Sequence, residues 1–140
     1  MNTYYFNDTN FKNTQIYRNF ISEYPSVGKL KIRAYAASEA IPISNLQIII
    51  STIYNDNNII FFDGRTDSSG VIEEIQLPTP KQNTNNLEVP TRLTYDITAK
   101  NDIGTINKVY KVNMYENVCV VQTINIIPDM NMNGLDVSGS

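Results

Sequence analysis

The sequence predicts an all-β domain, either an antiparallel sandwich or a barrel. From residue 29 onward, apolar and polar residues alternate with the period of two that is typical of half-buried strands. Clusters of asparagine, aspartate, glycine and proline interrupt this alternation at short intervals, as turns between strands do. No long pattern of helical period lies between these clusters, so strands are expected to follow strands along the chain.

Seven strands are expected. The first, KLKIRAYA, buries Leu30, Ile32 and Ala34 on one face. The second, NLQIIISTIY, has apolar residues on both faces, which indicates that both are partly covered. The fifth, RLTYDITAK, alternates throughout, and NIIFF, VIEEIQL, KVYKVNMY and VCVVQTINII complete the set. The expected ranges are residues 29–36, 45–54, 58–62, 71–77, 92–100, 108–115 and 118–127.

Residues 1–27 differ from the rest of the chain. They show no sustained alternation and lie before the break at Pro25 and Gly28. We therefore divide the chain into an N-terminal arm or short helix over residues 1–27, a β-sandwich domain over 28–128 and a flexible polar tail over 129–140. The chain has fourteen aromatic residues, nine tyrosines and five phenylalanines. The arm holds seven of these fourteen: Tyr4, Tyr5, Phe6, Phe11, Tyr17, Phe20 and Tyr24.

The aromatic arm is the candidate binding element. TQIYRNFISEY is expected to form about two helical turns with Ile16, Phe20 and Tyr24 on one face. Residues 3–11 are expected to dock on an edge strand, either of their own sandwich or of a neighbouring copy, because edge strands offer unpaired backbone groups. Deletion of residues 1–24 is expected to leave the sandwich folded. The candidate residues for binding a protein partner, or for self-association, are Tyr4, Tyr5, Phe6 and Phe11.

The composition argues against several functions. The chain has no histidine, so it has no Ser-His or Cys-His nucleophile and no ordinary zinc site. Its net charge of -3 gives no footprint for nucleic acid. No apolar stretch approaches the roughly 20 residues that cross a bilayer, so no membrane insertion is expected. The N-terminus lacks the basic start and apolar run of a classical secretory signal.

The stretch RTDSSG gathers acidic and hydroxyl side chains, and we interpret it as a turn. A calcium loop of the EF-hand type needs a glycine at its sixth position, and the glycine here is misplaced. Glu73 and Glu74 are neighbours on a strand, so they are expected on opposite faces and not as a glycosidase pair. Asp67 is expected to accept hydrogen bonds from backbone amides, and Gly70 to take a positive φ. No metal and no cofactor are expected.

Two further features have structural interpretations. Cys119 lies in the apolar strand VCVVQ without basic neighbours, so a buried, unreactive thiol is expected. Lys29, Lys31 and Arg33 point away from the buried face of the first strand and are expected to form a solvated row.

Several motifs in their order along the chain resemble the carboxypeptidase regulatory-like domain, a transthyretin-like β-sandwich. The later motifs resemble the non-catalytic module of clostridial spore cortex-lytic enzymes and related peptidoglycan-binding proteins. The chain departs from the pattern at Thr105 and at YEN, residues 115–117, where the family has aromatic and Phe-x-Gly motifs. The matching motifs are Gly28-x-Leu30, Ile41-Pro42-Ile43, Thr66-Asp67-x-x-Gly70, Leu77-Pro78-x-Pro80, Pro90 before Tyr95, VNMYENV and VVQTINIIP.

The resemblance implies a seven-stranded antiparallel Greek-key sandwich over residues 28–128 and no catalytic activity of its own. We therefore expect a non-enzymatic interaction module, an assembly or inhibitory partner in a spore or cell-envelope setting, located in the cytoplasm or associated with the spore of a bacterium. The alternative is a module that binds peptidoglycan or another glycan. Its exposed aromatic rings would be Tyr35, Tyr54 and Tyr110, because the chain has no tryptophan.

Overall fold

The computed structural model describes residues 1–37, 40–82 and 91–126, which fold into two β-sheets and two short helices. Most of the connection between the fourth and fifth expected strands and the expected tail over 129–140 lie outside the described residues. In chain order the elements are β1 (Thr3–Tyr5), α1 (Thr9–Lys12), α2 (Gln15–Glu23), β2 (Ser26–Ala36), β3 (Ile41–Pro42), β4 (Gln47–Tyr54), β5 (Asn57–Arg65), β6 (Val71–Thr79), β7 (Arg92–Lys100), β8 (Asn107–Tyr115) and β9 (Cys119–Ile126).

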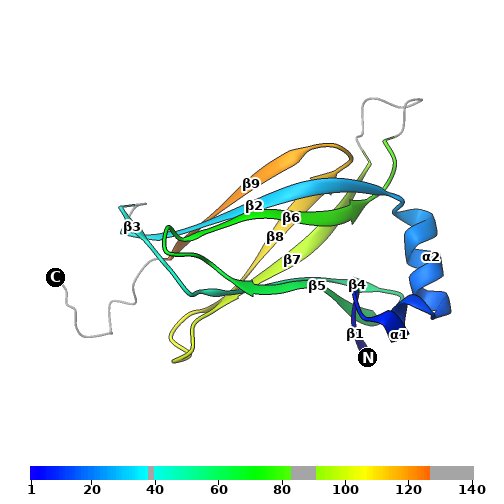
Figure 1. Ribbon diagram of the computed structural model, residues 1–140, viewed down its shortest axis with the longest axis horizontal. Coiled ribbons are helices and arrows are strands. Elements are labelled where there is room, and N and C mark those ends of the chain that lie inside the picture. The colour runs from blue at the N-terminus through cyan, green and yellow to red at the C-terminus, as the bar shows by residue number, and fades with distance from the viewer. Residues whose placement is uncertain (38–39, 83–90, 127–140) are drawn as a thin grey trace.

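The two sheets face each other as the layers of a sandwich (Figure 1). The five-stranded sheet has the order β1-β5-β4-β7-β8. In the four-stranded sheet, β2 pairs with β6 on one side and with β9 on the other. β3 pairs with the last two residues of β2, Tyr35 and Ala36, beyond Val71, where β6 begins.

The all-β sandwich class is confirmed, but the expectation of seven antiparallel strands was wrong in two respects. The described residues form nine strands, because β1 and β3 are additional to the seven expected. Two pairings are parallel, β1 with β5 and β2 with β9. Alternation reveals which face of a strand is buried but not which neighbour it pairs with, so the direction of pairing was not in the pattern.

The core lies between the sheets and is built by the alternation that the sequence shows. Leu30 and Ile32 of β2 and Ile48 and Ile50 of β4 are almost fully buried. Tyr95 of β7 is also fully buried, so its hydroxyl needs a partner. That partner is the carbonyl oxygen of Pro78 in β6, which accepts a hydrogen bond of 2.6 Å. This bond joins the two sheets across the core.

A β-bulge in β6 overturns the expectation for Glu73 and Glu74. Between the pairs that Ile75 and Ile72 make with β2, β6 advances by three residues but β2 by only two. β6 therefore holds one extra residue between these two buried isoleucines. Both glutamates therefore lie on the outer face of the sheet. Glu74 pairs with Lys29 at 3.8 Å, and Glu73 pairs with Lys31 at 3.2 Å.

The arm closes one end of the sandwich. Helix α2 stands across the gap between the two sheets at the end where β6 finishes and β2 begins (Figure 1). Phe11 and Phe20 are 1% and 0% exposed and belong to the core. The structure therefore argues against the expectation that residues 1–24 can be removed without loss of folding. Neither helix in the described ranges is long and apolar enough to cross a membrane.

Candidate functional site: an aromatic groove beside the arm

The N-terminal arm docks on the sandwich of its own chain. β1 adds to the edge of the five-stranded sheet in parallel with β5, with Tyr4 opposite Ile59. The backbone N–H of Phe6 donates to the carbonyl oxygen of Ile60 at 2.8 Å, which extends the pairing by one bond. The sequence left open whether the arm docks on an edge strand of its own sandwich or of a neighbouring copy. The structure shows docking on the chain's own edge strand.

Local sequence signals determine where α2 begins and ends. The hydroxyl of Thr14 accepts a hydrogen bond of 3.2 Å from the backbone N–H of Tyr17 and so caps the start of α2. Pro25 ends the helix, because a proline disfavours helical backbone in the residue before it. Phe20, the middle residue of the expected apolar face, is fully buried, and Ile16 and Tyr24 on either side are partly buried.

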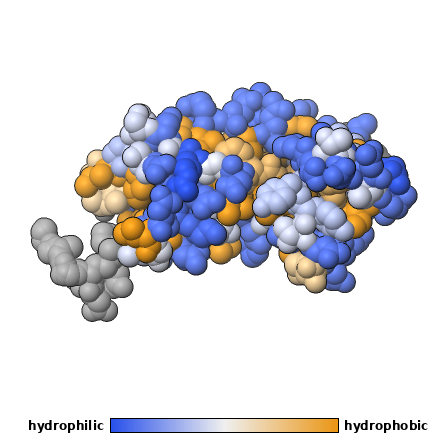
Figure 2. All heavy atoms as spheres, turned by 60° about the horizontal axis from the view of Figure 1, so that its bottom comes forward, coloured by the Kyte–Doolittle hydropathy of each residue, from blue (hydrophilic) through white to orange (hydrophobic). Residues whose placement is uncertain are grey.

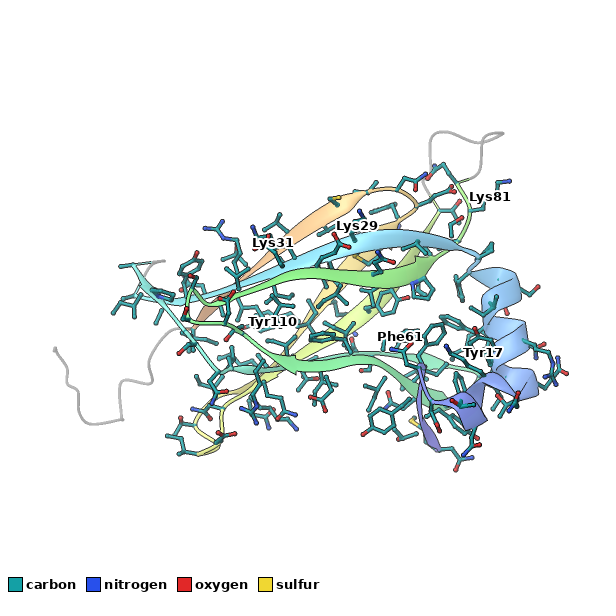
Figure 3. The ribbon with its side chains drawn as sticks, in the orientation of Figure 1. Tyr17, Lys29, Lys31, Phe61, Lys81 and Tyr110 are labelled. Atoms are coloured by element: carbon teal, nitrogen blue, oxygen red, sulfur yellow. The ribbon has the colours of Figure 1, made fainter. Side chains whose placement is uncertain are left out.

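The aromatic residues of the arm form one cluster with aromatic residues of the five-stranded sheet. Phe6 packs on Phe61 with ring centroids 4.7 Å apart, and Phe20 packs on Tyr54 at 5.2 Å in an edge-to-face arrangement. Phe61 in turn meets Tyr95 edge to face at 5.1 Å. Figure 3 shows Phe61 and Tyr17 at the end of the sandwich that the helices cover, where the ring of Phe6 contacts both. Such contacts stabilise a core beyond the area they bury.

The four residues expected to bind a partner have different environments. Phe11 is fully buried and stacks on Tyr4 at 5.0 Å, so both are occupied within the arm. Tyr5 is 54% exposed on the opposite side of β1. Figure 2 shows that hydrophobic and hydrophilic residues are mixed on the face of the molecule that it presents. Phe6 is the one of the four that lines the groove described next. The residue types were signalled by the sequence, but their orientation depends on the packing of the arm.

The groove lies between the arm and the edge of the four-stranded sheet, with a volume of about 430 Å³. This volume is within the usual range for ligand sites. Aromatic and aliphatic side chains dominate the lining, which contains no charged residue. The amides of Asn7 and Gln76 and the hydroxyl of Ser26 supply polar groups among Phe6, Tyr17, Ile21, Tyr24, Pro25, Val27, Leu77 and Pro78. Sequence reasoning missed all of these except Phe6, because they come together only when α2 closes the end of the sandwich.

One wall of the groove is a free strand edge. No strand among the described residues pairs with β6 on the side away from β2. The carbonyl of Pro78 points away from β2, because it accepts from Tyr95. In an antiparallel ladder, residues two apart direct their backbone groups to the same side, so Gln76 also directs its N–H and C=O to the free edge. A backbone donor and acceptor therefore face the groove beside its aromatic lining.

A buried tyrosine fixes the helix behind the groove. Tyr54, at the end of β4, is 7% exposed and donates a hydrogen bond from its hydroxyl to the Glu23 carboxylate at the end of α2. Desolvation by burial and this hydrogen bond raise the pKa of Tyr54 to about 12. Burial also raises the pKa of Tyr24, which lines the groove, and the nearby Glu23 adds to the shift. Both phenols are thus neutral at physiological pH.

Glu116 ties together three segments around Ser26, which lines the groove. Its carboxylate accepts hydrogen bonds from the backbone N–H of Gln82 at 2.7 Å and from the hydroxyl of Ser26 at 2.9 Å. These bonds hold the pKa of Glu116 below its usual value. They join the start of β2 to the segment after β6 and to the turn that precedes β9.

The RTDSSG stretch forms a turn between β5 and β6. One carboxylate oxygen of Asp67 accepts from the backbone N–H groups of Ser69 at 2.9 Å and Val71 at 3.0 Å. Gly70 has a φ of +77°, and a Cβ there would lie 2.5 Å from the carbonyl oxygen of Ala34. In the described part of the chain, no group of three or more acidic or cysteine residues is arranged to hold a metal ion.

The prediction of a buried thiol at Cys119 was wrong. Cys119 is exposed, because its register partner is Lys29 and both lie on the outer face of the four-stranded sheet. The apolar character of its strand reflects an exposed row that includes Val121, which is 54% exposed. The expected basic row is on this face too, where Lys29 and Lys31 have the glutamate partners described above.

The three tyrosines considered for glycan binding do not form one surface. Tyr54 is buried under α2. Tyr110 points between the two sheets, and its hydroxyl is buried without a partner among the described residues (Figure 3). Tyr35 alone has an outward position, where its ring contacts the guanidinium of Arg33 at 5.1 Å.

Comparison with protein-family models and with curated proteins finds no match to this sequence. The geometry of the groove is therefore the basis on which a function is argued.

Proposed function

We propose that this chain is a non-enzymatic interaction module that binds an extended segment of a protein partner in the aromatic groove. The observation that carries the proposal is the position of the groove directly beside the free edge of β6. An extended peptide adds to such an edge through its backbone while alternate side chains enter neighbouring pockets. Gln76 supplies the backbone donor and acceptor, and the groove supplies the pocket.

The lining suits an uncharged, apolar or aromatic side chain of the partner. Tyr17, Ile21 and Tyr24 present carbon-rich surfaces from one helix, and Pro25 and Pro78 flank them. Tyrosine is a frequent anchor residue at protein interfaces because it combines a large area with few rotatable bonds. The lining contains no carboxylate, amine or thiol to act as an acid, base or nucleophile, which supports binding rather than catalysis.

The proposal includes a finer assignment of fold and setting. The seven longer strands form two facing sheets over the range in which the sequence resembles transthyretin-like carboxypeptidase regulatory domains. We assign the sandwich to that class on this resemblance and, with it, a role as an assembly or inhibitory partner in a bacterial spore or cell envelope.

Peptidoglycan or another glycan is the second candidate ligand for the same groove. The amides of Asn7 and Gln76 lie among aromatic rings there, and this mixture of stacking faces and amide hydrogen bonds also suits a sugar. Glycan binding would not need the backbone edge of β6, which distinguishes the two candidates.

Selection of a peptide library on the immobilised chain tests the proposal. We expect enrichment of peptides with an aromatic or aliphatic residue in an extended context. Tyr17→Ala should weaken the selected peptides about thirtyfold, the loss typical of an interface hot spot of about 2 kcal/mol.

Tyr5→Ala is the matched control, because Tyr5 is an exposed tyrosine of the same arm outside the groove. Melting curves of both variants show whether the fold is retained. Saturable binding to purified peptidoglycan that is lost in Tyr17→Ala, with no peptide enriched, would favour the glycan instead. Equal peptide binding by both variants would remove the groove from the account.

A further inference from the structure

The long edge strands of the sandwich differ in how they are protected from pairing with another chain. Natural edge strands carry charges, prolines or bulges that discourage such pairing. β6 carries Glu73 and Glu74 at its bulge and also Pro78. β8 carries Lys111, which pairs with Asp96 at 2.6 Å, and Lys108, which lies on the core-facing side opposite the buried Ala99. Both strands therefore have protecting features.

β9 has none of these features. Its eight residues, CVVQTINI, contain no charge, no proline and no glycine. Its register with β2 is unbroken from Cys119 to Ile126, so no bulge twists the edge away. Val121 within β9 is 54% exposed, and Val118 just before the strand is 42% exposed. Among the described residues, β9 pairs with β2 alone.

The backbone groups that β9 offers can be identified. The carbonyl oxygen of Val118 accepts from the N–H of Lys29 at 3.0 Å, so Val118 directs its carbonyl toward β2. Backbone groups alternate in direction along a strand, so Cys119, Val121 and Thr123 direct their N–H and C=O to the free side. These groups form an uninterrupted row on an uncharged strand.

We propose that two copies of this chain associate by antiparallel pairing of their β9 edges. The fullest overlap places Val121 opposite Thr123 of the partner subunit, which brings two β-branched residues together across the new pair. A two-fold axis makes the contact self-complementary and closed. The two four-stranded sheets then form one continuous sheet across the dimer.

The charges around β9 favour a second copy as the occupant. A strand without charges meets its own copy without like-charge repulsion. Three basic residues of β2 lie beside β9: Lys29, Lys31 and Arg33. Lys29 and Lys31 have glutamate partners on β6, on the side of β2 away from β9, and Arg33 donates a hydrogen bond to the hydroxyl of Tyr35 and lies over its ring. Two identical faces can therefore approach each other with the two lysine charges compensated and the guanidinium held against Tyr35.

The dimer leaves the aromatic groove open in both subunits. The groove borders β6, and β6 and β9 lie on opposite sides of β2. The dimer therefore presents two grooves, and a partner with two binding segments gains from their linkage. The dimer itself does not depend on the function proposed for the groove.

Sedimentation equilibrium of the full chain in reducing buffer tests the proposal. We expect the mass to rise with concentration from 15.9 kDa to twice that value. Cys119 lies opposite Asn125 of the partner subunit in this register, so the dimer should persist without a disulfide. Val121→Lys should weaken association by about tenfold or more, because it places a lysine near the two-fold axis in each copy.

Val109→Lys is the matched control, because Val109 is an exposed valine on β8, an edge strand of the five-stranded sheet. This substitution should leave the dimer intact. Val121→Pro removes a backbone N–H that points to the free side and makes no hydrogen bond to β2, so this variant should also be monomeric. Its melting curve shows whether the fold is retained. A monomeric wild-type chain at every concentration would overturn the proposal. So would a dimer that Val121→Lys and Val109→Lys weaken equally.

Discussion

Gly28 lies where the backbone of β2 passes close to β8. A Cβ at this position would be 2.6 Å from the carbonyl oxygen of Tyr115, which belongs to the backbone and cannot rotate away. Gly28→Ala is expected to lower the free energy of unfolding by about 1–3 kcal/mol, the usual range for overpacking. Urea denaturation measures the change.

Gly64 offers a control at almost the same distance. A Cβ there would be 2.5 Å from the ring of Phe62, a partly buried side chain that can move. Gly64→Ala is expected to cost less than Gly28→Ala. An equal cost for both would show that close backbone approach is not the reason for glycine at position 28.

Asp67 stabilises its turn through two backbone hydrogen bonds to one carboxylate oxygen. Asp67→Ala is expected to lower the free energy of unfolding by about 1 kcal/mol, the usual net value of such a bond. Asp67→Asn keeps an oxygen acceptor and should cost less. Added calcium should not change the melting temperature of the wild type, and a rise of several degrees would contradict the interpretation as a turn.

Tyr54 makes stability depend on alkaline pH. Its pKa is raised to about 12 in the folded state, mainly by burial and then by the bond to Glu23. A raised pKa means that the neutral phenol is favoured in the folded state. Its contribution is therefore complete below the unfolded value of about 10 and is lost as pH rises toward 12. Burial raises the pKa of Tyr95 too, so the effect has the same sign there.

The urea midpoint is therefore expected to be level from neutral pH to about 10 and then to fall. Tyr54→Phe should make this fall shallower, because the variant has no hydroxyl to ionise at that site. A midpoint that stays level up to pH 12 would contradict the assignment of buried, neutral phenols.

At the level of elements, the arm is the part of the chain that tertiary structure redefines. Phe20 is fully buried between Tyr54, Tyr24 and Phe61. Phe20→Ala is expected to lower the free energy of unfolding by about 3–5 kcal/mol. Tyr5→Ala, on the exposed side of the same arm, should change it by no more than about 0.5 kcal/mol.

Deletion of residues 1–24 removes both Phe11 and Phe20 from the core. Two losses of about 3–5 kcal/mol each are comparable to the whole stability of a typical domain, about 5–15 kcal/mol. The truncated chain is therefore expected to lose cooperative thermal unfolding. A sharp transition at the wild-type temperature would show that the arm is accessory to the sandwich.

The longer strands could be predicted because each has a strong periodic pattern. β7 has the expected bounds, Arg92–Lys100, and β2 ends as expected at Ala36. β1 and β3 are too short to show any period, and each exists only because a longer strand offers a pairing edge. The bulge at Glu73 and Glu74 breaks the alternation within a single strand, so counting by two put one of them on the wrong face.

The candidate site was predictable only in composition. The aromatic excess of residues 1–27 marked the arm as an unusual element, and its docking on an edge strand follows from general properties of sheets. Which aromatic residues enter the core depends on how α1 and α2 turn the chain across the end of the sandwich. Tyr17 and Tyr24 face the groove for that reason, whereas Tyr4 and Phe11 pack inside.

At the level of the whole molecule, the two open edges of the four-stranded sheet have different surroundings. The edge at β6 borders an uncharged aromatic groove, and the edge at β9 is uncharged and has an unbroken register. We propose partner binding at the first and self-association at the second. The arm connects these assignments to stability, because the helix that closes the core also forms one wall of the groove.

Chemical-shift mapping with a library-selected peptide tests the central claim most directly. Backbone amide signals of the full chain are recorded as the peptide is added. We predict that the largest shifts occur at Gln76, Tyr17, Ile21 and Tyr24, and that the Gln76 amide becomes protected from hydrogen exchange as it gains a backbone partner. Shifts confined to β9, or to the outer face around Tyr5, with Gln76 unchanged, would contradict the assignment of the groove as the binding site.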